Sequence, residues 1–452
     1  MSIQLAQEPR HRNILTPQAN APVVPTSLDS LHIPVVVLEN LLLKQLSAFP
    51  KSDVLQLSRL MAISSHLVED LIAMLRKKSL VEVFQAETVS YYTNSNSPGH
   101  VRYGLSENGA AQAEVAFRKD SYIGPTPVSL DEYNRMVEAQ DVRANIVTRP
   151  DVTYALRDVF GAERMISVLG PAINSGRALL LYGDAGTGKT YVATRLLNSL
   201  NTSVYIPYAV YAAGNVIKVF SKQHHKPVTN DVPNQGISYK DQYDKRWVLS
   251  ERPSIQVGGE LTMEMLEVNH SEHNRVWMAP LQMMANNGIF VIDDLGRQPM
   301  PVDAILNRWI VPMEYFYDYL SLPNGQQITI PFILTLAFST NLDPEKISDP
   351  AFLRRLGYKI QFHPLERSEY HALWEEMASS KKVTVQASSF DALYDLHRRN
   401  SIGFYPCLPK DLIGISRDII AFEDIEPVVT PEILERAWEV YFTADGNGGG
   451  AR

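Results

Sequence analysis

Hydrophobic positions recur at helical spacing near the start of the chain. Leu38, Leu41, Leu42 and Leu46 fall on one side of a helix that the pattern predicts over residues 36–49. Capping residues and one alternating run predict the next elements: helices over 53–61 and 65–77, the latter capped by Ser65, strands over 80–84 and 101–105, and a helix that begins at Ser106. We therefore expect a compact domain over residues 31–122.

The segments on either side of this domain lack such a pattern. Residues 1–30 contain prolines but no periodic apolar positions, so we expect a flexible arm. The Gly124–Pro127 stretch is typical of a break between domains, and residues 123–146 are predicted to be a linker. The glycine-rich end of the chain predicts a disordered tail over residues 444–452.

Short apolar runs predict buried strands in the middle of the chain. They are Ala178–Tyr182, Ile289–Ile292 and a run from Phe332 that ends at Asn341. A periodic segment follows the first run, and an Asn324-Gly325 turn predicts a hairpin between the second and the third. Strands that alternate with helices predict an α/β core with a parallel sheet, which we place at residues 147–364.

The first two strands of this core are separated by a long segment. A strand, a turn at Ala213-Gly214-Asn215 and a second strand lead into an insertion over residues 212–275. We expect a helix from Thr262, on which His270 and His273 would have an i, i+3 spacing. Without a third ligand, two histidines favour solvated side chains over a metal site. The insertion is expected to face a pore or a client, and the sequence does not distinguish these roles.

The last part of the chain is predicted to be helical. Apolar residues recur at helical spacing in four segments: residues 366–377, 389–399, 409–422 and 431–442. Pro431 at a first helical position supports the last of them. We expect a helical lid over residues 365–443.

Composition and charge exclude several classes of protein. The chain has 452 residues, of which 45% are hydrophobic and 20% charged, as expected of a globular protein with two or three domains. Its net charge of −8 argues against a general polyanion binder, and its single cysteine, Cys407, excludes an internal disulfide. No signal-peptide pattern opens the chain and no apolar run could span a bilayer. We therefore expect a soluble cytoplasmic protein without membrane insertion.

A glycine-rich loop follows the first predicted strand of the core. It fits the pattern G-x-x-x-x-G-K-[ST], and consists of Gly183, Asp184, Ala185, Gly186, Thr187, Gly188, Lys189 and Thr190, followed by Tyr191. Glycines allow backbone N–H groups to turn toward phosphate oxygens, and the helix N-terminus adds positive charge. Lys189 would reach the β- and γ-phosphates, and the Thr190 hydroxyl would bind Mg²⁺. This motif predicts nucleotide binding, with ATP and Mg²⁺ as cofactors.

Polar residues end the next two predicted strands. Asp293 and Asp294 follow Ile289–Ile292, and Asn341 ends the third strand. We expect Asp293 to contribute to the Mg²⁺ shell and Asp294 to polarise the attacking water. The Asn341 amide could orient that water against the γ-phosphate.

Three basic residues further along the chain are candidates for contact with a nucleotide. Arg354 and Arg355 come at a helix end beyond the strands, a position that suits an arginine delivered to the nucleotide of a neighbouring subunit. Lys410 lies near the start of a late helix.

The order of these motifs resembles that of the AAA+ ATPase superfamily, over residues 147–442. Residues 183–190 match Walker A and residues 289–294 match Walker B, and Asn341 matches sensor 1. Arg355 is similar to the arginine finger, with Arg354 as the alternative, and Lys410 stands where sensor 2 usually has arginine. The resemblance implies a P-loop parallel-sheet core with a helical lid that moves with nucleotide state.

Two departures from the family pattern bear on activity. Most members end Walker B in Asp-Glu, and Asp294 is one methylene shorter. Lys410 cannot form the bidentate contact that arginine forms. The hairpin around Asn324-Gly325 resembles the pre-sensor-1 insertion, which points to the MoxR-like clade.

The predicted N-terminal domain resembles a winged helix-turn-helix, as the step over Leu105–Gly109 also indicates. Such domains often bind DNA. Residues 31–120, however, contain nine Lys or Arg and nine Asp or Glu, and the third helix has Glu69 and Asp70 where bases would lie. Since duplex binding depends on phosphate neutralisation, this balance favours a protein partner over DNA.

These features together predict a Mg²⁺-dependent ATPase that assembles as a homo-oligomeric ring, expected to be a hexamer. It would remodel a protein client in a chaperone-like way. A DNA-linked motor or regulator and a nucleotide-gated scaffold with little turnover stay open as alternatives.

Overall fold

The computed structural model describes residues 16–17, 19–84, 101–144, 146–200, 202–228, 243–271, 275–322, 324–347 and 350–443. The chain divides into two compact units that do not follow the predicted boundaries. The first consists of Met1–Asn145, Leu200–Phe290 and Pro299–Thr335, and the second of Ile146–Ser199, Val291–Gln298 and Leu336–Arg452. The predicted insertion therefore groups with the N-terminal segment, and the predicted lid groups with the glycine-rich loop.

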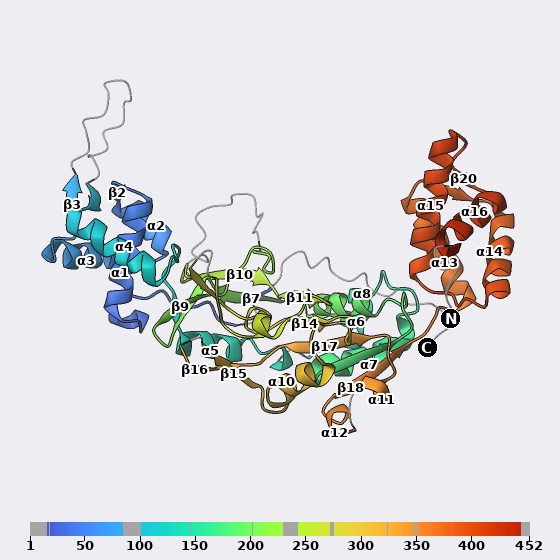
Figure 1. Ribbon diagram of the computed structural model, residues 1–452, viewed down its shortest axis with the longest axis horizontal. Coiled ribbons are helices and arrows are strands. Elements are labelled where there is room, and N and C mark those ends of the chain that lie inside the picture. The colour runs from blue at the N-terminus through green and yellow to red at the C-terminus, as the bar shows by residue number, and fades with distance from the viewer. Residues whose placement is uncertain are drawn as a thin grey trace, which may run out of the picture. The chain divides into compact units, whose positions relative to one another are not determined.

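The N-terminal part of the first unit has the predicted helices and strands (Figure 1). They are α1 (Val35–Ala48), α2 (Val54–Met61), α3 (Ser65–Lys77), β3 (Val81–Phe84), β4 (Arg102–Leu105) and α4 (Glu107–Lys119). A short strand that was not predicted, β2 (Ser52–Asp53), pairs with β4. The Asp53 carboxylate caps α2 by accepting a hydrogen bond from the Gln56 N–H. The predicted cap at Ser65 is wrong by one residue, because Ser64 has the extended backbone that precedes α3.

Two segments predicted to lack structure are ordered in part. In the predicted flexible arm, β1 (Thr16–Pro17) pairs in parallel with β7 (Thr202–Pro207), and the Pro22 carbonyl accepts a hydrogen bond from the Asp244 N–H. The predicted linker contains β5 (Val128–Ser129) and α5 (Leu130–Ala139), which opens with a capping box between Ser129 and Glu132. These corrections have one cause, since contacts with distant strands order both segments. The predicted tail over 444–452 lies outside the described residues.

The insertion forms strands rather than the predicted helix. The insertion and its two flanks contain β8 (Ala209–Ala212), β9 (Asn215–Lys218), β10 (Trp247–Glu251), β11 (Ser254–Val257), a 3-10 turn (Met263–Leu266), β12 (Asn269–Ser271) and β13 (Val276–Met278). The turn at Ala213-Gly214 joins β8 to β9 as predicted. The helix from Thr262 is wrong, because only the 3-10 turn forms before β12.

The predicted hairpin is present in the first unit. After α9 (Leu281–Met284) and α10 (Val302–Tyr315), β15 (Tyr317–Ser321) pairs antiparallel with β16 (Gln327–Pro331). Arg308 of α10 donates to both carboxylate oxygens of Asp318 in β15, at 2.6 and 2.9 Å, which fixes the hairpin against the helix.

A five-stranded sheet has the order β11-β14-β17-β6-β18, where β14 is Ile289–Ile292, β17 Thr335–Thr340, β6 Leu179–Gly183 and β18 Tyr358–Phe362. Strand β6 runs parallel to both of its neighbours, with Leu181 opposite Ser339 on one side and Ile360 on the other. The apolar runs are explained by burial, since every residue of β14 and β17 is buried. The α/β class with a parallel sheet core is confirmed.

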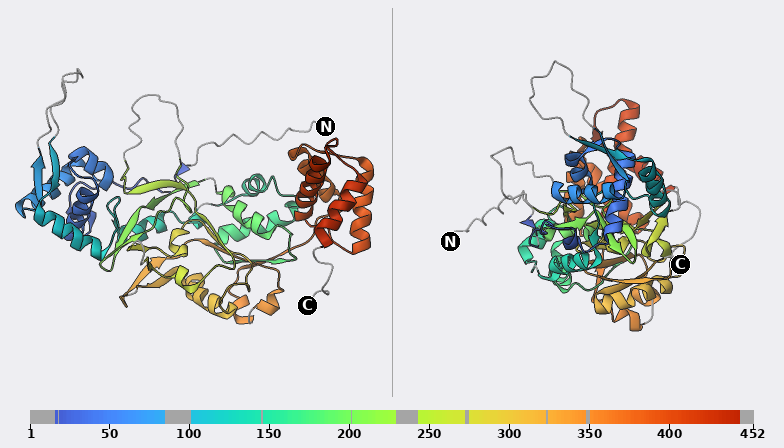
Figure 2. Two further views of the ribbon diagram at one scale, coloured as in Figure 1. Left: turned by 45° about the horizontal axis from the view of Figure 1, so that its top comes forward. Right: turned by 90° about the vertical axis from the view of Figure 1, so that its left-hand side faces the viewer.

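Helices complete the second unit. They are α6 (Arg149–Ala155), α7 (Glu163–Ser175), α8 (Lys189–Arg195), α11 (Pro344–Ile347), α12 (Pro350–Leu353), α13 (Arg367–Ser380), α14 (Ala387–Asn400), α15 (Cys407–Glu423) and α16 (Pro431–Thr443). The last four confirm the four predicted helices and form a bundle, which we call the lid (Figure 2). Trp374 and Tyr370 are fully buried in its core. No helix in the described ranges is long and apolar enough to cross a membrane.

Candidate functional site

The glycine-rich loop, which we call the phosphate loop (residues 183–190), connects β6 to α8 in the second unit. Gly186 and Gly188 have φ of 79° and 85°, a region that side chains with a Cβ rarely adopt. Gly188 has open space around its missing Cβ, whereas a Cβ on Gly186 would overlap the Cys407 Sγ. The sequence therefore needs glycine at 188 for backbone conformation, and at 186 for conformation and space.

Lys189 is buried and lies at the centre of the site. Its Nζ donates to the carbonyl oxygens of Gly183 and Asp184 and to Oδ1 of Asn341, each at 2.8 Å. Burial lowers the pKa of Lys189, and the nearby carboxylates of Asp293, Asp294 and Asp184 oppose that shift. The structure thus brings together two residues that are 152 positions apart, both predicted from sequence.

The loop threonine meets the first predicted carboxylate. Thr190 Oγ1 donates to Asp293 Oδ1 at 2.8 Å and lies 3.5 Å from Ser339 Oγ. Hydroxyl and carboxylate oxygens are the ligands that Mg²⁺ prefers, so the donor set fits that ion. Asp293 Oδ1 also accepts from the Asp294 N–H at 3.0 Å, which orients the carboxylate.

Asp294 occupies an unusual backbone position. Its φ is 48°, in the left-handed region, and its side chain is half-buried. Gln298 fixes this turn because its Nε2 donates to the Asp293 carbonyl at 2.9 Å. The Leu295 N–H donates to the Ser339 carbonyl at 2.9 Å, which joins the turn to β17.

The remaining predicted residues lie at exposed positions. Arg354 and Arg355 follow α12, and Lys410 is in the first turn of α15. Tyr191 in α8 is 46% exposed, and the Arg195 guanidinium stacks on its ring at 4.0 Å. These four side chains are not part of the buried cluster around Lys189.

Tyr405, Cys407, Gln298 and Ser339 contact the site but were not predicted. Tyr405 Oη donates to Asp184 Oδ2 at 3.0 Å, and the Cys407 N–H donates to the Gly186 carbonyl at 3.3 Å. Tyr405 precedes α15 and Cys407 is its first residue, so both are far from the loop in sequence. No local sequence pattern predicts their contacts with the loop. The sequence shows only that Tyr405-Pro406-Cys407 comes just before a predicted helix.

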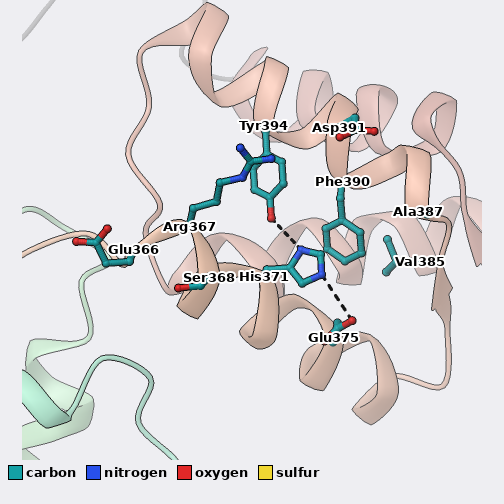
Figure 3. A pocket seen from close by; sticks show the side chains of 10 residues that line it. All are labelled: Glu366, Arg367, Ser368, His371, Glu375, Val385, Ala387, Phe390, Asp391 and Tyr394. Carbon is teal, nitrogen blue, oxygen red and sulfur yellow. Dashed lines mark hydrogen bonds and ion pairs between the residues drawn. The ribbon is translucent and has the colours of Figure 1, made fainter.

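The lid also has a polar groove of about 910 Å³, which we call the lid groove (Figure 3). His371 Nδ1 and the Tyr394 hydroxyl are 2.8 Å apart, and the Arg367 guanidinium stacks on the Tyr394 ring at 3.9 Å. His371 also packs against Phe390, with ring centroids 3.9 Å apart and the ring planes tilted by 35°. No residue of the phosphate loop lines this groove.

The histidine pair in the insertion does not form the predicted arrangement. His270 lies in β12 and packs on Trp277, while His273 lies outside the described residues. Within the described ranges, no group of three or more His, Cys, Asp or Glu side chains could hold a metal ion.

Fold and site together define an α/β protein with a phosphate loop at the carboxyl end of a parallel strand. One family description matches residues 366–440, which is most of the lid: "Domain of unknown function (DUF8689)". No curated protein matches the chain.

Two solved structures illustrate the level of structural similarity. The Thermotoga maritima RuvB Holliday junction branch migration motor is 16% identical, with 65% of this chain and 70% of that chain covered and a TM-score of 0.34. NtrX from Brucella abortus is 13% identical, with 72% and 66% covered and a TM-score of 0.38.

Proposed function

We propose that the chain is a Mg²⁺-dependent ATPase of the AAA+ type. The observation that supports this most directly is the pair of side-chain contacts Lys189–Asn341 and Thr190–Asp293, each at 2.8 Å. They join the phosphate loop to the ends of two strands that follow it in sequence. The same residues would surround a triphosphate with one cation, one carboxylate, one hydroxyl and one amide.

Each residue has a chemical role that follows from its position. Lys189 would exchange its loop carbonyl partners for phosphate oxygens, which are stronger acceptors. Thr190 and Asp293 would hold Mg²⁺, which neutralises phosphate charge when bound. Asp294 would polarise the attacking water, and Asn341 would orient it.

Assembly into a homo-oligomeric ring, with six subunits expected, is part of this proposal. Arg354 and Arg355 are exposed after α12, so one of them could reach the nucleotide of a neighbouring subunit. Lys410 is exposed in α15 and would act in sensing the γ-phosphate. The ring would use hydrolysis to remodel a protein client that the N-terminal domain or the insertion recognises, in the cytoplasm.

Replacement of the second carboxylate tests the ATPase proposal. Asp294→Asn should keep ATP binding and reduce turnover about 100-fold or more, since it removes the group that polarises water. Asp391→Asn in the lid groove is a matched control that should leave both unchanged. Normal hydrolysis by Asp294→Asn would refute the assigned role, and absence of turnover in the wild type would favour the nucleotide-gated scaffold.

A nucleic-acid-linked motor is the second candidate. The arrangement of α2, a left-handed residue at Ala62, α3 and the β3–β4 strand pair is compatible with a winged helix that binds DNA. The exposed Glu69 and the balanced charge of residues 31–120 argue against it. Steeply salt-dependent binding of the full chain to duplex DNA, lost in Arg76→Glu, would support this candidate over the protein-client proposal.

A further inference from the structure

The lid touches the phosphate loop through the residues that open α15. Tyr405 Oη donates to the Asp184 carboxylate at 3.0 Å, and the Cys407 N–H donates to the Gly186 carbonyl at 3.3 Å. Tyr405 and Asp184 are 221 positions apart, and both belong to the second unit. The contact is therefore a tertiary link between two parts of one unit.

This link is close as well as polar. The Cys407 Sγ fills the space where a Cβ of Gly186 would lie, so any side chain at that position would displace one of the two segments. The conformation of the loop and the position of the first turn of α15 are thus mechanically coupled at this point.

Charge gives the tyrosine contact a specific consequence. Asp184, Asp293 and Asp294 all act electrostatically on Lys189. A nucleotide would bring further negative charge to the loop, and an unrestrained Asp184 carboxylate would repel it. The Tyr405 hydroxyl donates to that carboxylate from the lid side, which fixes its direction and stabilises its charge.

We infer that Tyr405 is a positioning residue of the nucleotide site, which holds the Asp184 carboxylate and links the lid to the phosphate loop. This inference rests on the proposed binding of ATP at the loop. The link is thus made by a tyrosine that precedes α15, whereas the exposed Lys410 lies in the first turn of that helix. Nucleotide binding should tighten the link, because phosphate charge would repel the Asp184 carboxylate and the hydrogen bond from the Tyr405 hydroxyl offsets that repulsion.

A hydroxyl deletion tests the role of Tyr405 in the full chain. Tyr405→Phe should weaken ATP binding about fivefold and raise KM with kcat within about twofold, the loss expected for one exposed hydrogen bond to a charged group. Tyr394→Phe, which removes a lid hydroxyl that contacts His371 instead, is the matched control and should change neither constant. Equal binding by Tyr405→Phe, Tyr394→Phe and the wild type would overturn the inference.

Removal of the Asp184 charge separates positioning from a general structural effect. In an Asp184→Asn background, Tyr405→Phe should no longer weaken ATP binding, because no carboxylate is left to hold. An equal loss in both backgrounds would show that Tyr405 acts by another route and would overturn the inference. If Lys189→Ala binds ATP as tightly as the wild type, the proposed function fails instead, since that result does not depend on Tyr405.

The single cysteine of the chain provides a second readout. Burial raises the pKa of the Cys407 thiol, so a maleimide should label the wild type slowly. We expect Tyr405→Phe to speed the labelling and a non-hydrolysable ATP analogue to slow it in the wild type. Labelling rates that change with neither the variant nor the nucleotide would contradict a link between lid and loop.

Discussion

The phosphate loop and the lid groove are both polar clusters in the second unit, yet they differ in construction. Around the loop, Lys189 is buried and its partners come from segments far apart in sequence. In the groove, His371 contacts Tyr394 and Glu375 from α13 and α14, which are consecutive helices, and Arg367 is exposed. Burying a charge costs free energy that hydrogen bonds only partly offset, so a buried lysine that distant segments surround indicates a functional site. Polar contacts at a helix surface need no function.

Loss of the loop lysine should have the largest effect. We expect Lys189→Ala to weaken ATP binding about 100-fold or more, because no other buried cation lies at this loop to pair with phosphate charge in the described part of the unit. Isothermal titration calorimetry measures the change. Lys346→Ala, at an exposed lysine of α11, and Arg367→Ala in the lid groove should bind as the wild type does. If Arg367→Ala also abolished binding, the distinction between the two clusters would be wrong.

The lid should depend on packing rather than on its groove. Trp374 is fully buried and meets Tyr370 edge-on, so Trp374→Ala should lower the free energy of unfolding by about 3–5 kcal/mol. Chemical denaturation measures this loss. Phe422→Ala, at a lid aromatic that is 90% exposed, should change stability by less than about 0.5 kcal/mol. Similar losses in both variants would show that the lid core is not where the buried aromatics place it.

The sequence predicted the loop cluster better than its surroundings, for a physical reason. Lys189, Thr190 and Asp293 belong to short motifs whose chemistry depends on residue type and local order, so a linear pattern identifies them. The lid helices could be predicted equally well, because the helical spacing of apolar residues is a local pattern in the sequence. Tyr405 and Cys407 contribute through contacts with residues about 220 positions away, and no local pattern encodes such contacts.

The wrong predictions in the first unit have the same cause. The Thr262 segment has helical spacing, but the strands that flank it impose an extended path, and only a 3-10 turn forms. Residues 16–17 and 128–129 lack periodicity because each supplies a short edge strand to a sheet formed by other segments. Tertiary pairing decided these elements, so propensity alone failed.

Substitution at a loop glycine should lower stability moderately. Comparison of two glycines separates backbone strain from steric overlap with the lid. Gly186→Ala and Gly188→Ala both place a Cβ on a left-handed backbone, at a cost of about 1–2 kcal/mol. Only Gly186→Ala also overlaps Cys407 Sγ, so it should be the less stable variant in thermal unfolding. Adding Cys407→Ala should recover that difference without removing the strain. Equal stability of the two glycine variants would mean that the lid does not pack on the loop.

The smallest expected effect is a pH dependence that arises from a buried histidine of the lid. His397 is buried, with Nε2 3.0 Å from the Tyr370 hydroxyl, and burial lowers the pKa of His397 from its usual 6.5. Between the folded and unfolded pKa values the unfolded chain binds the proton and the folded chain does not, so stability rises with pH. The stabilisation is complete above pH 6.5 and is lost as the pH falls below that value. Denaturation of the wild type and of His397→Gln across this range should show a shallower acid decline in the variant. An unchanged decline would place the acid sensitivity outside the lid core.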